Sequence, residues 1–354
     1  MVDHPCPPPV DLALRSQPVL QASCAFAEEH RALQERRQTK STLNYQRLHC
    51  LTAIRGQLGD DPAKVASLST LLVAVLLLYF LEGYIDYTNS DTSTRCHFLG
   101  VLAILDTLGD FEAAWVSSDQ MTRVLLSEFA STDLTDALLQ DRRPCFPTKI
   151  WDIMESGSVS WEMSRGTKSL ATVFSTMSEM SSYLHAIRNG ADASNECIQE
   201  FERALQPSYS MLNSSVTAST SARQELLEPA TASSFSLLHA FQHAGLIYLY
   251  SAILDIPTQN FPVQQHVHAF VECIHGIDVN SRVQNCALYP LYVAGAHAII
   301  ETHRIYILER FDIIYSNLGF QSVQAIQSAL QHLWAPPEGS KNWTGTFKGA
   351  QYLH

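Results

Sequence analysis

The chain has 354 residues, of which 46% are hydrophobic and 16% are charged, and its formal net charge is −12. This composition is typical of a folded globular protein with a substantial core and excludes a largely disordered chain. The negative charge argues against binding to phosphate backbones, and no basic run interleaved with aromatics is present, so we expect no direct nucleic-acid binding.

Apolar residues recur at helical spacing along most of the chain, which predicts one large all-α domain of about 11 to 13 helices over residues 16–335. The expected helices cover Ser16–Arg37, Ser41–Leu58, the segment from Asp61 to about Gly83, Cys96–Leu108, Ser118–Leu139, Thr167–Arg188, Asn195–Leu205, Phe235–Leu254, Val263–Ile277, Leu288–Phe311 and Ser322–Leu333. Three other segments are expected to lack regular structure: a proline-rich, disordered tail (1–15), a mobile loop rich in Ser and Thr (207–234) and a C-terminal tail (336–354).

The segment Leu288–Phe311 is expected to be the central helix of this domain. It is apolar on more than one face, which is typical of a buried helix, and Pro290 falls in its first turn, where proline is tolerated. The small residues Ala294, Gly295 and Ala296 leave room for a neighbouring helix.

The eight cysteines show no CxxC pair and no zinc-ligand spacing, so we expect reduced thiols inside the cell. The start of the chain has neither the basic nor the apolar part of a signal peptide, which favours the nucleus or cytoplasm. The most apolar run, Leu71–Leu81, is about half of the ~20 residues that a membrane span needs, and it predicts a core helix and no membrane association.

Several passages together resemble the fungal-specific transcription factor domain, the regulatory region of fungal regulators with a binuclear zinc cluster. In the last third these are AFQHAGLIYLYSAILDIP with VQQHVHAFVECIHGI, ALYPLYVAGAHAIIETHR, and SNLGFQSVQAIQSALQHLW. Upstream, LQASCAFAEEHRAL, LNYQRLHCLTAIRGQL, HFLGVLAIL and SEFASTDLTDALLQDRRPCF are similar to earlier motifs of the family in the same order. The resemblance covers most of residues 16–335 and implies an all-α fold.

Two departures shape what the resemblance implies. The six-cysteine DNA-binding cluster is absent from these residues, and His297 stands where the family usually has an acidic residue. The resemblance therefore implies a transcription-regulatory protein without its own DNA-binding module, which senses a metabolite or binds a protein partner or a second copy, in secondary metabolism. A gene whose zinc cluster lies upstream of Met1 is a further alternative.

An enzyme is the second hypothesis. Glu128, Asp133 and Asp136 lie on one predicted helix, and paired carboxylates can hold Mg²⁺ while a diphosphate binds, as in helical terpene cyclases. The sequence TDLTD lacks the first acid of their DDxxD motif, so a capping or solvated role is the alternative. Outside this enzyme hypothesis, no cofactor is expected.

Small-molecule sites in helical domains often lie between helices, and aromatic side chains suit an apolar ligand. The candidates for such a pocket are Tyr248, Tyr289, Tyr292, His297 and Glu301. The same aromatics can be ordinary core residues, and His297 with Glu301 can be a polar pair in the core. His239 and His243 also have i, i+4 spacing, for which we expect a core or interface role.

Overall fold

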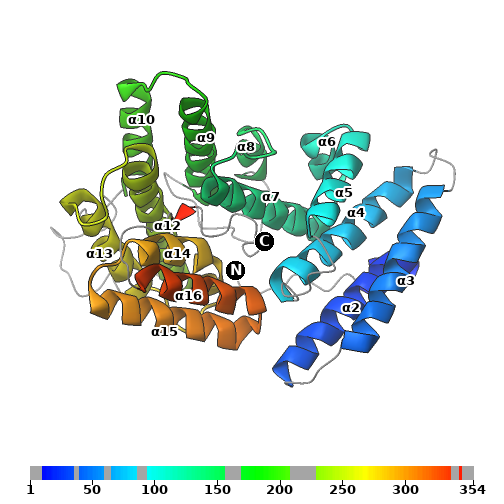
Figure 1. Cartoon of the computed structure of the whole chain (residues 1–354). Coiled ribbons are helices and arrows are strands. Elements are labelled where there is room, and N and C mark those ends of the chain that lie inside the picture. The colour runs from blue at the N-terminus through cyan, green and yellow to red at the C-terminus, as the bar shows by residue number, and fades with distance from the viewer. Residues whose placement is uncertain are drawn as a thin grey trace.

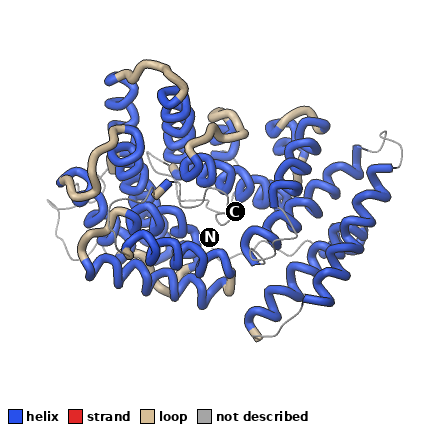
Figure 2. Tube along the Cα trace, in the orientation of Figure 1, coloured by secondary structure: helices blue, strands red, loops and turns tan. Residues whose placement is uncertain are grey.

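A computed structural model describes residues 10–35, 40–59, 65–85, 94–155, 169–207, 229–335 and 343–344. These residues form fifteen α-helices, two π-helical segments and one 3₁₀ segment, and no strand occurs among them (Figure 2). The expected all-α domain is confirmed. The segment 208–228, within the loop expected at 207–234, lies outside the described residues.

The first third of the chain forms a group of long helices on one side of the molecule (Figure 1). Its elements are α1 (Val10–Arg15), α2 (Gln17–Gln34), α3 (Lys40–Gly59), α4 (Val65–Phe80) and the π segment η1 (Leu81–Ile85). Helix α2 packs against α3 and α4. Residues Leu68–Ile85 are long and apolar enough to cross a membrane, but 72% of this stretch is buried inside the fold, as in a core helix.

The middle of the chain connects this group to the rest of the molecule. Its elements are α5 (Thr94–Thr107), α6 (Phe111–Ser117), α7 (Gln120–Gln140), α8 (Ile150–Glu155), α9 (Leu170–Arg188) and α10 (Asn195–Leu205). Helix α7 packs against α4 on one side and α9 on the other (Figure 1). Asp119, Ser169 and Ser194 cap α7, α9 and α10, because each side chain accepts a backbone N–H of the first turn.

The last third forms a second group of helices around α12. Its elements are α12 (Pro229–Tyr248), η3 (Leu249–Ile253), α13 (Phe261–His275), η4 (Arg282–Ala287), α14 (Leu288–Ala296), α15 (Glu301–Leu318) and α16 (Gln321–Trp334). Helix α12 packs against α13, α14, α9 and η4, and α16 packs against η1 of the first third. The first and last thirds of the chain therefore contact each other where η1 meets α16.

The expected central helix Leu288–Phe311 is wrong as one helix: it is two, α14 and α15, with a break after Ala296. The break is stabilised by side chains from other segments. Gln264 of α13 donates to the carbonyl of His297 at 2.8 Å, and Trp334 of α16 donates to that of Gly295 at 3.0 Å. Because carbonyls freed at a helix end need donors, these distant side chains make the break stable.

The small residues of α14 let α16 approach closely, as expected. A Cβ atom added at Gly295 would lie only 2.8 Å from Leu330 Cδ1. Leu330 is fully buried at this contact.

Three boundaries also differ from the expectation. A helix begins at Val10 inside the expected N-terminal tail, α3 begins at Lys40 and not at Ser41, and α12 begins at Pro229 inside the expected loop. In the expected C-terminal tail, Trp343 packs against the core.

Candidate functional site

The three acidic residues proposed as metal ligands all lie on α7, inside the fold. Asp133 is 1% exposed and Asp136 is 7% exposed. Glu128 is half-buried, two turns before Asp136 on the helix. The carboxylates of Asp133 and Asp136 therefore need partners within the protein.

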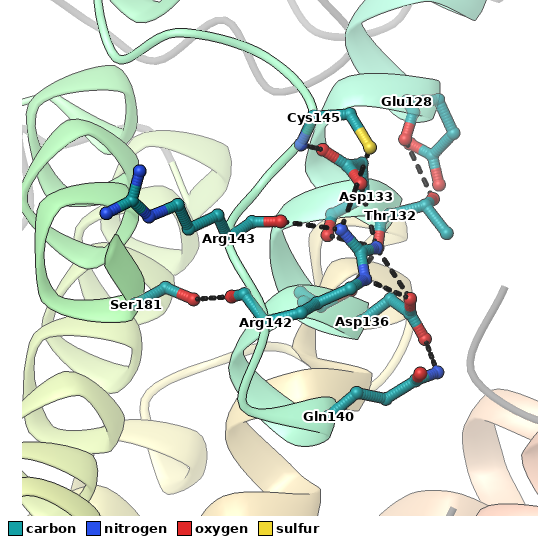
Figure 3. Close-up of polar contacts among 10 residues, drawn as sticks. Glu128, Thr132, Asp133, Asp136, Gln140, Arg142, Arg143, Cys145 and Ser181 are labelled. Atoms are coloured by element: carbon teal, nitrogen blue, oxygen red, sulfur yellow. Dashed lines mark hydrogen bonds and ion pairs between the residues drawn. The ribbon is translucent and has the colours of Figure 1, made fainter. Parts of the chain in front are cut away.

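Arg142, just after the end of α7, folds back onto two of these acids (Figure 3). Its Nη2 atom lies 2.8 Å from Asp133 Oδ1 and 2.6 Å from Asp136 Oδ2. The backbone N–H of Cys145 donates to Asp133 Oδ2 at 2.7 Å, and Gln140 donates to Asp136. We call Arg142, Asp133 and Asp136 the Arg142 clasp.

The pKa values of Arg142 and Asp133 are shifted mainly by burial and by the charges of the clasp itself. Burial alone would lower the pKa of Arg142, but the two carboxylates raise it above its usual value, so the guanidinium stays charged. Burial raises the pKa of Asp133, and Arg142 and the Cys145 N–H oppose that rise. Ser181 of α9 donates to the Arg142 carbonyl at 2.7 Å, which joins the clasp to the next helix. The arrangement is that of a structural ion pair.

The magnesium hypothesis finds no set of ligands in this geometry. Asp133 and Asp136 are occupied by Arg142, whereas Glu128 is not part of the clasp and lines a separate cavity. Among the described residues, no group of three His, Cys, Asp or Glu side chains is placed to hold a metal ion.

Glu128 faces a partly open cavity of about 270 Å³ between the two groups of helices. Its walls come from η1, α7, α9, α12, η4, α14, α16 and the end of α15. The lining residues are Tyr84, Glu128, Ser131, Thr132, Thr135, Leu170, Phe174, Phe241, Asn285, Cys286, Leu288, Tyr289, Leu318, Phe320, Ser322 and Ile326. Most of this surface is apolar or aromatic, which is typical of a small-molecule site.

One end of the cavity is organised around Glu128. The Tyr84 hydroxyl donates to Glu128 Oε1 at 2.8 Å and lies 3.0 Å from the Thr132 hydroxyl oxygen. The Tyr84 ring stacks on Phe320, with 5.5 Å between the ring centroids. Burial raises the pKa of Glu128, and the Tyr84 hydrogen bond partly opposes this rise. This end therefore combines a carboxyl group with aromatic walls.

Two other residues of the wall, Tyr289 and Asn285, each carry a buried polar atom without a hydrogen-bond partner among the described residues. The Tyr289 hydroxyl and the Asn285 Oδ1 atom are buried and form no hydrogen bond in the described part of the chain. The Tyr289 side chain, 6% exposed, stacks against Phe241 with 6.3 Å between ring centroids. Because buried polar groups are nearly always hydrogen-bonded, these two atoms are exceptions within the described part of the chain.

Cys286 contributes a thiol to the same wall. Its side chain is exposed and lines the cavity. Burial, followed by the charge of Glu128, raises the pKa of this thiol to about 12. A neutral thiol is a soft contact for an apolar ligand and a poor nucleophile.

Three of the other predicted pocket residues lie away from the cavity, around Trp343. The Tyr292 hydroxyl donates to the Trp343 carbonyl at 2.7 Å, and the ring of Tyr248 lies edge-on to the indole at 6.0 Å. His297 is buried beside the same indole, whereas Glu301 is exposed at the start of α15. Of the five candidates, only Tyr289 lines the cavity; the slot formed by Tyr248, Tyr292 and His297 is filled by Trp343.

The sequence profile of the fungal specific transcription factor domain matches residues 9–348. The chain belongs to the fungal specific transcription factor domain family. Among the curated proteins and the solved structures, none matches this chain. Membership confirms the resemblance drawn from the motifs and supports a transcription-regulatory role and an intracellular location.

Several contacts in this fungal transcription factor domain were not predicted from the sequence. Tyr84 and Asn285 belong to the cavity but stand in no recognisable motif. His243 Nδ1 lies 3.1 Å from His266 Nδ1, so His243 has a partner on α13 that its spacing from His239 did not indicate. Burial lowers the pKa of His243 to about 3, which keeps this pair uncharged. The pair is a core contact between α12 and α13, as the sequence suggested for His243.

Proposed function

We propose that this transcription-regulatory domain binds a small apolar molecule in the cavity beside Glu128, and that occupancy controls a contact with a protein partner in the nucleus. The observation that carries the proposal is the cavity itself, whose largely apolar and aromatic wall surrounds space for a small molecule and includes the carboxyl group of Glu128.

The position of the cavity supports a regulatory role for the ligand. Tyr84 and Glu128 reach it from η1 and α7, whereas Asn285, Tyr289 and Phe320 reach it from the last third of the chain. A bound molecule would contact both groups of helices. Since a ligand shifts a conformational equilibrium only by binding one state better, a site shared by two parts of the fold suits this purpose.

The enzyme alternative has less support in the same cavity. A prenyl diphosphate needs Mg²⁺ or basic side chains, and no Lys, Arg or His is among the described residues that line the cavity. The two acids nearest the expected motif are held by Arg142.

The test uses N-phenyl-1-naphthylamine, a neutral apolar dye that fluoresces when it leaves water. We expect saturable fluorescence with the purified chain and its loss in Cys286→Phe, whose ring would fill the cavity. The matched control is Cys96→Phe, because Cys96 is exposed on α5, away from the cavity lining. Equal dye binding by the two variants would contradict the proposal.

The proposed location has a separate test. A fluorescently tagged copy is expected to accumulate in the nucleus of a fungal cell. A signal confined to the cytoplasm under all growth conditions would contradict the nuclear part of the proposal and leave ligand binding to be judged by the dye.

A further inference from the structure

We propose that the cavity selects molecules carrying a protonated amine, which binds at the carboxylate of Glu128 while the apolar body of the ligand fills the remaining space. This inference rests on the proposed function, because it names the chemical class of the ligand for the same cavity. It is carried by the charge and hydrogen bonding of the lining residues.

The first observation is the charge of the walls. Glu128 is the one acidic residue among the described lining residues, and none of them is Lys, Arg or His. Burial holds the pKa values of Tyr84, Tyr289 and Cys286 above their usual values, so these groups stay neutral. Burial also raises the pKa of Glu128, and a cation bound beside Glu128 would lower that pKa and favour the carboxylate. An anion would enter without a counter-ion, whereas a cation would find one.

The second observation is that one carboxylate oxygen of Glu128 has no hydrogen-bond partner in the described part of the chain. Tyr84 donates to Oε1, and no hydrogen bond or ion pair to Oε2 occurs in the described part of the chain. Arg123, the nearest basic residue along the chain, donates to the Trp115 and Val116 carbonyls. Arg142 is committed to Asp133 and Asp136. An ammonium group donating to Oε2 would therefore complete the hydrogen bonding of Glu128 without displacing an existing partner.

The third observation concerns the rest of the ligand. Leu170, Phe174, Phe241 and Ile326 offer an apolar and aromatic surface, which suits a compact hydrocarbon body and also tolerates positive charge. Ser131, Thr135 and Ser322 also line the cavity, so a ligand with a second polar group can form further hydrogen bonds there. The class is thus an apolar amine, with or without a second polar substituent.

The experiment compares three compact probes with the same hydrocarbon body: 1-adamantanamine, 1-adamantanol and 1-adamantanecarboxylate. Calorimetric titration of the full chain at pH 7 should give a Kd at least tenfold lower for the amine than for the alcohol, and no detectable binding of the carboxylate. In Glu128→Gln the preference for the amine over the alcohol should disappear. The control Glu112→Gln should keep it, because Glu112 is half-exposed on α6 and pairs with Lys149 away from the cavity.

The outcomes separate the two proposals. Equal binding of the amine and the alcohol, or tighter binding of the carboxylate, overturns the inference and leaves a ligand cavity. Failure of all three probes together with the neutral dye overturns the proposed function itself. If Glu128→Gln does not fold, as judged by circular dichroism, the comparison of the three probes on the unmodified chain still decides the question.

Discussion

The indole of Trp343 packs edge-on against the imidazole of His297, with 4.7 Å between the ring centroids and 79° between the ring planes. This contact ties a residue near the C-terminus to the break between α14 and α15. It also occupies the slot beside Tyr248 and Tyr292 that the sequence had suggested for a ligand.

Removal of Trp343 is expected to destabilise the fold. Trp343→Ala should lower the free energy of unfolding by about 2–3 kcal/mol, toward the lower end of large-to-small substitutions, because the indole is only partly buried. Urea unfolding followed by circular dichroism measures the change. Trp343→Phe should recover much of the loss, and a Trp343→Ala variant as stable as the unmodified chain would show that the tail does not support the break.

The Arg142 clasp makes a second prediction. Arg142→Ala should cost about 3–5 kcal/mol, because it leaves Asp133 and Asp136 buried without a counter-ion. Arg143→Ala is the matched control, since Arg143 is the exposed neighbour and contributes its backbone carbonyl to Arg142. Similar unfolding midpoints in urea for the two variants would contradict a structural role for the clasp.

The buried His297 predicts a pH dependence of stability. Burial lowers the pKa of His297 to about 4, against a value near 6.5 in the unfolded chain. Between about pH 6.5 and pH 4 the unfolded chain binds a proton that the folded chain does not. Stability should therefore fall as the pH falls through this window, by up to about 1.4 kcal/mol per pH unit for this group.

The variant His297→Gln should reduce this slope, as measured by urea unfolding at several pH values. The exposed His49 gives the control, and His49→Gln should keep the slope of the unmodified chain. An unchanged slope in His297→Gln would mean that other groups cause the acid sensitivity.

The close approach of α14 and α16 predicts opposite effects at two helical glycines. Gly295→Ala should destabilise by about 1–2 kcal/mol, because the new Cβ would press on Leu330. Gly56→Ala, in α3, meets nothing within 4 Å and should stabilise by up to about 1 kcal/mol through helix propensity. Thermal unfolding of both variants measures the difference, and a gain in stability at position 295 would contradict the packing described.

The helices themselves could be predicted from local periodicity, and α10 has the expected bounds. The break after Ala296 could not, because the bonds that stabilise it come from Gln264, Arg304 and Trp334, which are distant in sequence or lie beyond the break. Apolar periodicity reports which faces are buried and does not report where a distant donor meets a carbonyl.

Only part of the candidate site was predicted, and Glu128 was selected for a role other than the one that its surroundings indicate. Glu128 was selected as a metal ligand beside Asp133 and Asp136, and the structure places it instead beside Tyr84 at a cavity wall. Arg142 follows Asp136 by only six residues, so an ion pair between them could have been expected from the sequence, but it was not predicted. The meeting of Tyr84, Glu128 and Tyr289 depends on how three elements pack, which spacing along the chain does not encode.

A ligand cavity at the meeting of the two groups of helices can be seen in a crystal structure of the chain with 1-adamantanol. We expect density for the probe inside the cavity, in contact with Phe174 and Ile326 and close to Glu128. Density for the probe only at another surface, with this cavity closed by its own side chains, would show that the cavity does not bind such a molecule.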